Sequence, residues 1–177
     1  MLDHCGGFAL SLTKWEHEKV GKLAAWVEAN GWQRKVSAQI ILGLSETYSM
    51  KWMIKELARN GIRQVTLLGY KSFGRGVNVK PRTINITEII ECARENYVTL
   101  GLDTMAVQNY SDVLDEVGIN PLLRTEHEGR FSCYVDAVER TIARDSYTEE
   151  CHEFHTDWRK RDGKTAGDVL DSVFPFN

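Results

Sequence analysis

The residues of this sequence that could carry chemistry fall into two groups, of which one is a Cys/His cluster. It is formed by Cys151, His152 and His155, and Glu149 or Asp157 could complete a ligand set. A spacing of four residues, as between Cys151 and His155, puts two side chains on one face of a helix. A zinc site needs three or four such ligands. Because polar segments with two histidines are common, we predict no metal site here.

The other group is a loop, residues 69–81, that is rich in glycine and basic residues. Its centre is Gly74-Arg75-Gly76. Backbone N–H groups in such a loop, together with the Arg75 guanidinium, can hold an anion or a nucleotide. The same glycines serve equally well in a solvated turn, where a positive φ is needed. Both interpretations stay open at this stage.

Composition places these groups in an ordinary globular protein. The chain has 177 residues, 42% of them hydrophobic, and a net charge of −3, which argues against a nucleic-acid binder. No apolar run is long enough to span a membrane, and the N-terminus has no features of a secretory signal. The four cysteines are far apart, with no CxxC pair. We therefore expect reduced thiols in a cytoplasmic protein.

Alternating strands and helices must position these residues. Four apolar segments predict strands, and a segment with helical periodicity follows each of them. Four such units predict a parallel sheet, and they are too few to close an eight-fold barrel. The expected fold is therefore α/β, with a half-barrel or an open, mostly parallel sheet in residues 1–146 and an extension in 147–177. The expected strands are residues 8–13, 35–42, 64–68 and 97–102.

The C-terminal part of the chain shows a different pattern. Residues 122–125 and 131–138 flank Glu128-Gly129, which predicts a β-hairpin. A short helix is expected over residues 166–173.

Three of the strand ends also carry a family resemblance. The segments are Phe8-Ala-Leu-Ser-Leu-Thr13, Gln39-Ile-Ile-Leu-Gly43-Leu-Ser-Glu46 and Leu67-Leu-Gly-Tyr-Lys-Ser-Phe-Gly-Arg-Gly76. Together they resemble the second half of a radical S-adenosylmethionine enzyme. The first is similar to that family's fourth strand, where a polar side chain faces the ribose. The second resembles the GxIxGxxE motif beside the adenine, with Gln39 in place of the first glycine. The third resembles the sixth strand and the loop after it.

The resemblance implies a set of nucleotide contacts at the carboxyl edge of the sheet. Two acidic residues near that edge also have a structural interpretation. Glu46 could simply sit in the first turn of a helix, where the helix dipole favours it. Asp103 is expected to be a helix N-cap. The contacts implied by the resemblance are Ser11, Thr13, Gln39, Ile41, Gly43, Glu46, Leu68, Gly69, Gly74, Arg75 and Gly76.

One departure from the family decides what chemistry to expect. The family's cluster cysteines, spaced CxxxCxxC, and its methionine-binding acidic motif belong to earlier strands, and this chain begins after both. A [4Fe–4S] cluster needs thiolate ligands held together. We therefore expect no catalysis by the family's route from this chain alone. Between Gly43 and Gly76 we expect at most weak binding of S-adenosylmethionine or a related nucleotide.

Two functions follow from this reasoning. The first is a non-catalytic, protein-binding regulator or inhibitor, of which a phage-encoded anti-defence protein is one instance. The alternative is the C-terminal portion of a radical S-adenosylmethionine enzyme that needs an N-terminal half carrying the cluster. In both, the strand at Phe8 lies at an open edge with no proline or lysine before Lys14. We predict a homodimer or a protein partner there, with Trp15, Trp32 and Trp158 as contact candidates.

Overall fold

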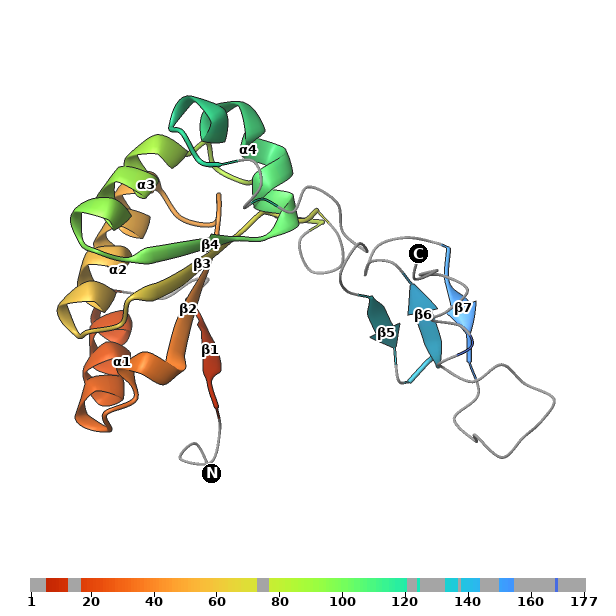
Figure 1. The fold of residues 1–177 in the computed structure, drawn as a ribbon, viewed down its shortest axis with the longest axis horizontal. Helices are drawn as coiled ribbons and strands as arrows, with labels where there is room; N and C mark the ends of the chain where they lie inside the picture. The colour runs from red at the N-terminus through yellow and green to blue at the C-terminus, as the bar shows by residue number, and fades with distance from the viewer. Residues whose placement is uncertain are drawn as a thin grey trace. The chain divides into compact units, whose positions relative to one another are not determined.

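A four-stranded parallel sheet is the framework of the first part of the chain (Figure 1). The structure is a computed structural model and describes residues 6–12, 17–72, 77–120, 124, 133–136, 138–143, 150–154 and 168. The chain divides into two compact units, Met1–Glu126 and His127–Asn177, and the boundary at 146/147 stays a prediction. The elements of the first unit are β1 (Phe8–Ser11), α1 (His17–Ala29), η2 (Gln33–Lys35), β2 (Val36–Ile41), α2 (Thr47–Arg59), β3 (Gln64–Leu68), α3 (Ile86–Glu95), β4 (Thr99–Leu102) and α4 (Thr104–Glu116).

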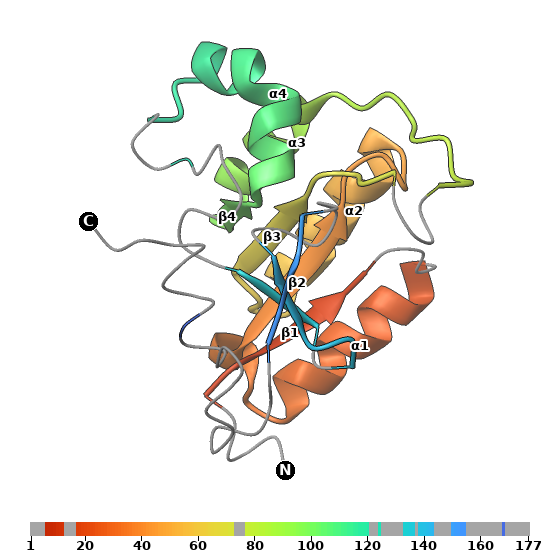
Figure 2. The ribbon, with the colours of Figure 1, turned by 90° about the vertical axis from the view of Figure 1, so that its right-hand side faces the viewer.

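The four strands lie in the order β1-β2-β3-β4, and each neighbouring pair is parallel. Helices α1, α2 and α3 form one layer on one face of this sheet (Figures 1 and 2), and α4 packs on α3, β3 and β4. Successive crossovers of one hand produce this sequential order. The predicted α/β fold with an open parallel sheet is therefore confirmed, and within the described residues the sheet does not close into a barrel.

Strand β2 shows how the sequence assigns the two faces of the sheet. Val36, Ala38 and Ile40 are fully buried and belong to the core beneath the helices. Ser37 and Gln39 alternate with them, and side chains one residue apart in a strand point to opposite faces. The sheet therefore has an apolar face covered by helices and a polar face on which none of the described helices packs, called the helix-free face below.

The helices end in a repeated motif. Asn30, Asn60 and Asn96 follow α1, α2 and α3, and each donates its side-chain N–H to the carbonyl oxygen four residues earlier, at 2.8, 2.8 and 2.7 Å. The next residue has a positive φ in each case, and it is glycine in the first two. After α3 it is Tyr97, with φ of 54° and an 86% exposed side chain. This is a backbone conformation that glycine adopts without steric cost.

The second unit contains a small antiparallel sheet of β5 (Tyr134–Asp136), β6 (Thr141–Ala143) and β7 (His152–Glu153). The described partner of β5 is β6, the segment that follows it. Asp136 explains this turn, because its Oδ1 accepts the backbone N–H groups of Val138 and Glu139, both at 2.9 Å. Most of the hairpin expected between residues 122–125 and 131–138 lies outside the described residues, including its Glu128-Gly129 turn. So does the expected C-terminal helix, apart from Asp168.

Candidate functional site

A row of polar side chains crosses the helix-free face of the parallel sheet. The strand register aligns Ser11 with Gln39, Gln39 with Thr66, and Thr66 with Gly101. The Ser11 hydroxyl donates to Gln39 Oε1 at 3.3 Å, and the hydroxyl oxygens of Ser37 and Thr66 lie 3.3 Å apart. Hydroxyl and amide groups donate and accept hydrogen bonds without ionising near neutral pH. This row can therefore bind and orient a polar ligand, but it offers no general acid or base.

The end of the row at β4 has no side chain, because the residue there is Gly101. A Cβ at this position would lie 3.5 Å from Thr66 Oγ1. Any larger residue would cover the Thr66 hydroxyl from that side. The Thr66 hydroxyl therefore has open space on the side of β4, where Gly101 carries no side chain.

Four of the residues named from the sequence meet on this helix-free face. Ser11 and Gln39 belong to the polar row, while Ile41 and Leu68 face each other across β2 and β3 nearer the carboxyl edge. Both are half-buried. The resemblance placed these four near a nucleotide, and that assignment stays a prediction.

Sequence reasoning missed Ser37 and Thr66. The available signal was the alternation of apolar and polar residues, which in β2 puts Ser37 on the same face as Gln39. Thr66 lies between Val65 and Leu67 in β3, and this short, mainly apolar segment predicts a strand without marking Thr66 as a site residue. Only the register shows that it stands beside Gln39.

Gly43, at the carboxyl end of β2, has a packing role in this structure. Its φ is 84°, and a Cβ there would lie 3.0 Å from the Cβ of Pro81. The Gly43 carbonyl accepts the backbone N–H of Arg82 at 2.9 Å. Glu46, the N-cap residue of α2, forms an ion pair with the Arg82 side chain. The segment Pro81–Arg82 therefore packs against the end of β2, at the position where the resemblance places an adenine.

Gly69, at the carboxyl end of β3, is also in close contact with another part of the chain. A Cβ there would come within 2.5 Å of backbone atoms of Met105 and Ala106. The first turn of α4 therefore rests directly on Gly69. Asp103 is the N-cap of α4, as predicted, and its side chain accepts the Ala106 N–H.

The remaining residues named from the sequence are not all described. Thr13, Trp15, Gly74, Arg75, Gly76, His155 and Trp158 lie outside the described residues. Cys151 is exposed and His152 half-buried, and His152 belongs to strand β7 rather than to a helix. His152 pairs with Ile142 of β6, and the shared helix face of Cys151 and His155 stays a prediction because His155 lies outside the described residues. Among the described residues, no group of three His, Cys, Asp or Glu side chains is placed to hold a metal ion.

Trp32 lies beside the edge strand β1. Its ring contacts Phe8 edge-on at a centroid distance of 6.1 Å, and it contacts Trp26 in the same way at 5.0 Å. Trp32 packs against the core, whereas Trp26 is 45% exposed. The three rings form an aromatic cluster that links β1 to α1 and reaches the surface through Trp26.

Comparisons of this chain with protein families, with curated proteins and with solved structures find no match. The fold and the site together define an α/β protein with an open parallel sheet, helices on one face and a polar row on the other. Within the described ranges, no helix is both long and apolar enough to cross a membrane.

Proposed function

We propose that this protein is a non-catalytic binding module that regulates or inhibits another protein by contacting it through the free edge of β1. The observation that carries this proposal is the position of β1, which in the described part of the chain pairs on one side only, with β2. Its residues, Phe8–Ser11, include no proline and no charge. Natural edge strands usually carry such blocking features, and an edge without them is a template for pairing.

The backbone of β1 also supports this proposal. The Leu12 N–H donates to the Gln39 carbonyl at 2.8 Å, so the polar groups of Leu12 face β2. Backbone groups of successive residues in a strand point to opposite sides. Those of Ala9 and Ser11 therefore point to the free edge, where an added strand would pair with them. The aromatic cluster of Phe8, Trp32 and Trp26 adds apolar area next to this edge.

The test uses proline to remove one outward N–H. Ala9→Pro deletes that donor but no hydrogen bond of the β1–β2 ladder, and Phe8 before it already has the extended backbone that a following proline favours. The matched control is Ala9→Ser, which keeps the N–H. We expect light scattering to show a dimer or a complex for the natural chain and for Ala9→Ser, and a monomer for Ala9→Pro. A natural chain that is monomeric and associates with no other chain would contradict the proposal.

The polar row favours a second candidate function, in which this sheet completes a barrel of the radical S-adenosylmethionine type. A barrel interior is lined by one face of each strand. The row formed by Ser11, Gln39 and Thr66 would lie on that inner face and would hydrogen-bond the hydroxyl groups of a nucleoside. In this case the strands that join β1 would supply the cluster.

Two measurements separate these candidates. If this chain is part of an enzyme, anaerobic reconstitution followed by an absorption scan should show an iron–sulfur band only when a second chain is present. A band from this chain alone would contradict the binding-module proposal. Calorimetric titration with S-adenosylmethionine should show a weak heat of binding. Thr66→Val should remove this heat. Gln64→Leu changes a residue on the same face but outside the row, and should leave the heat unchanged. Absence of heat at millimolar nucleotide would contradict the barrel candidate.

A further inference from the structure

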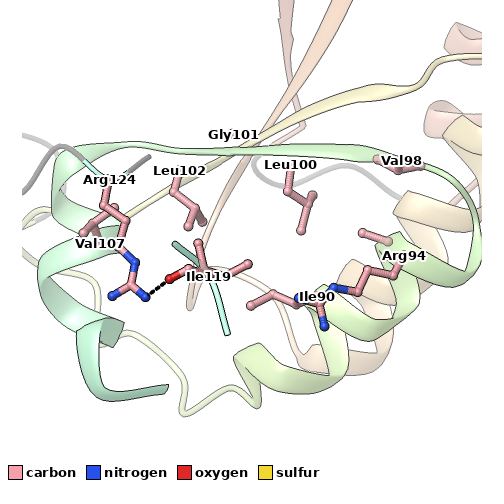
Figure 3. Close-up of a pocket in the computed structure, with 10 residues that line it drawn as sticks. Ile90, Arg94, Val98, Leu100, Gly101, Leu102, Val107, Ile119 and Arg124 are labelled. Carbon is pink, nitrogen blue, oxygen red and sulfur yellow. Dashed lines mark hydrogen bonds between the residues drawn. The ribbon is translucent and has the colours of Figure 1, made fainter. Parts of the chain in front are cut away.

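A cavity of about 420 Å³ lies beside β4, at the other edge of the sheet from the interface proposed above. It lies between β4, α3 and the segment that follows α4 (Figure 3). This volume falls in the lower part of the range for small-molecule sites, about 300–1,000 Å³. Most of the lining is apolar, and its largest apolar side chains are Ile90, Leu100, Leu102, Val107 and Ile119.

Arg124 places a cation in this apolar wall. Its side chain is only 2% exposed. Nη1 pairs with Asp115 Oδ1 at 2.7 Å and Nη2 donates to the Ile119 carbonyl, but Nε is buried without a hydrogen-bond partner. A buried donor left unsatisfied costs free energy, which a ligand that accepts a hydrogen bond would recover.

A second cation lines the same cavity. Arg94 extends from the end of α3, and its Nη2 donates to the Val117 carbonyl at 3.1 Å. Figure 3 shows Arg94 and Arg124 at opposite sides of the cavity, with Ile119 and Leu102 between them. Asp115 neutralises one of these two charges, and its side chain is 64% exposed. The cavity therefore keeps an excess of positive charge around an apolar floor.

We propose that this cavity binds a small monocarboxylic acid with an apolar body. The carboxylate accepts the Arg124 Nε–H once a shift of that side chain opens Nε to the cavity, and the apolar body covers Leu100, Leu102 and Val107. Charge-assisted hydrogen bonds to arginine are among the stronger polar contacts in proteins. A neutral apolar molecule would leave Nε unpaired, and a bare anion would leave the apolar wall uncovered. Both parts of the ligand are therefore required.

The probe for this proposal is octanoate. The control molecules are 1-octanol, which lacks the carboxylate, and acetate, which lacks the apolar body. Backbone amide shifts of the full chain, recorded by NMR, should follow octanoate with a dissociation constant on the order of 0.1–1 mM, which suits a ligand of this size. The largest shifts should fall at residues 100–102 and at Ile119. Octanol and acetate should bind at least about tenfold more weakly, since each loses one of the two interactions. Equal binding of octanol, or no saturable shift with octanoate, would overturn the proposal.

Variants of the polar groups should change octanoate affinity in opposite directions. Asp115→Asn removes the anion that competes for Arg124, so octanoate affinity should rise about threefold to tenfold, as expected for a charge partner lost at the edge of a site. Arg124→Met should abolish binding. Arg63→Gln is the control for Arg94→Gln, because Arg63 also donates to a backbone carbonyl, that of Asn96, and does not line the cavity.

Arg94→Gln should weaken octanoate binding, and Arg63→Gln should not change it. Asp115 is at the surface, so its variant is expected to fold even if Arg124→Met does not. An unchanged or lower affinity in Asp115→Asn would contradict the assignment of Arg124 as the anion donor.

Discussion

The backbone N–H of Gly69 donates to Oδ1 of Asp103 at 2.8 Å, across 34 residues of sequence. The same carboxylate oxygen accepts the N–H of Ala106, also at 2.8 Å. One side chain thus joins the carboxyl end of β3 to the first turn of α4. Glycine is required at position 69, because Met105 and Ala106 occupy the space that a Cβ would need.

Gly69→Ala should destabilise the protein by about 1–3 kcal/mol, the usual cost of overpacking, because the Cβ meets backbone that cannot rotate away. Chemical denaturation monitored by circular dichroism measures this change. Gly6→Ala is the control, since a Cβ at Gly6 has nothing within 4 Å. Equal stability of the two variants would show that α4 moves away from β3 at little cost.

Asp103→Ala should cost about 1–3 kcal/mol, because it removes an N-cap and leaves the buried Gly69 N–H without an acceptor. Asp103→Asn keeps an oxygen at the Oδ1 position and should retain most of the stability. The free energies of unfolding of the two variants, compared with the natural chain, separate the hydrogen bonds from the charge. A loss in Asp103→Asn as large as that in Asp103→Ala would assign the effect to the charge.

Tyr97→Gly should stabilise the protein by about 1 kcal/mol, because it relieves a left-handed backbone conformation that costs a residue with a Cβ about 1–2 kcal/mol. The melting temperature should rise by roughly 2–4 °C. Gly118→Ala is the reciprocal control: Gly118 has φ of 72° with open space around it, so alanine there should destabilise through the backbone alone. A lower melting temperature for Tyr97→Gly would mean that the exposed Tyr97 ring makes a stabilising contact.

The ion pair between Lys51 of α2 and Glu88 of α3, at 2.7 Å, makes stability depend on pH. The hydrogen bond from Lys51, followed by its charge, lowers the pKa of Glu88 below its ordinary value of 4.5. A carboxyl with a lowered pKa contributes stability above its unfolded pKa and loses it as the pH falls through the folded pKa. The hydrogen bond to Glu88 likewise raises the pKa of Lys51 above 10.5, so the contribution of Lys51 is lost only at a pH above that value.

Glu88→Gln should therefore be less stable than the natural chain between about pH 5 and pH 10, with a difference that shrinks as the pH falls below 4.5. Melting temperatures recorded across this range give the comparison. Glu91→Gln is the matched control, because Glu91 is an exposed glutamate of the same helix. The same pH profile for both variants would remove the assignment to the Lys51–Glu88 pair.

The sequence was sufficient for the order of the strands and helices in the first unit and for the residues at which α1 and α2 end. The β2 strand follows from its alternation of apolar and polar residues. Helices α1 and α2 each end just before an Asn-Gly pair, Asn30-Gly31 and Asn60-Gly61, in which the glycine has a positive φ. These are local preferences of the backbone, which a short stretch of residues determines by itself. The N-cap role of Asp103 is local in the same sense, since its side chain reaches an N–H three residues ahead.

Long-range geometry decided the rest. Gly43 and Gly69 belong to motifs that suggest a nucleotide, but whether a ligand or another part of the chain lies against them depends on where Pro81 and Met105 come to rest. The neighbours of Thr66 follow from strand register, and a shift of one residue would turn the polar row toward the helices. Arg124 lies outside every helix and strand, so no periodicity marks it as buried. Sequence patterns report which residues repeat along the chain, whereas a site forms from residues that only the packing of distant segments brings together.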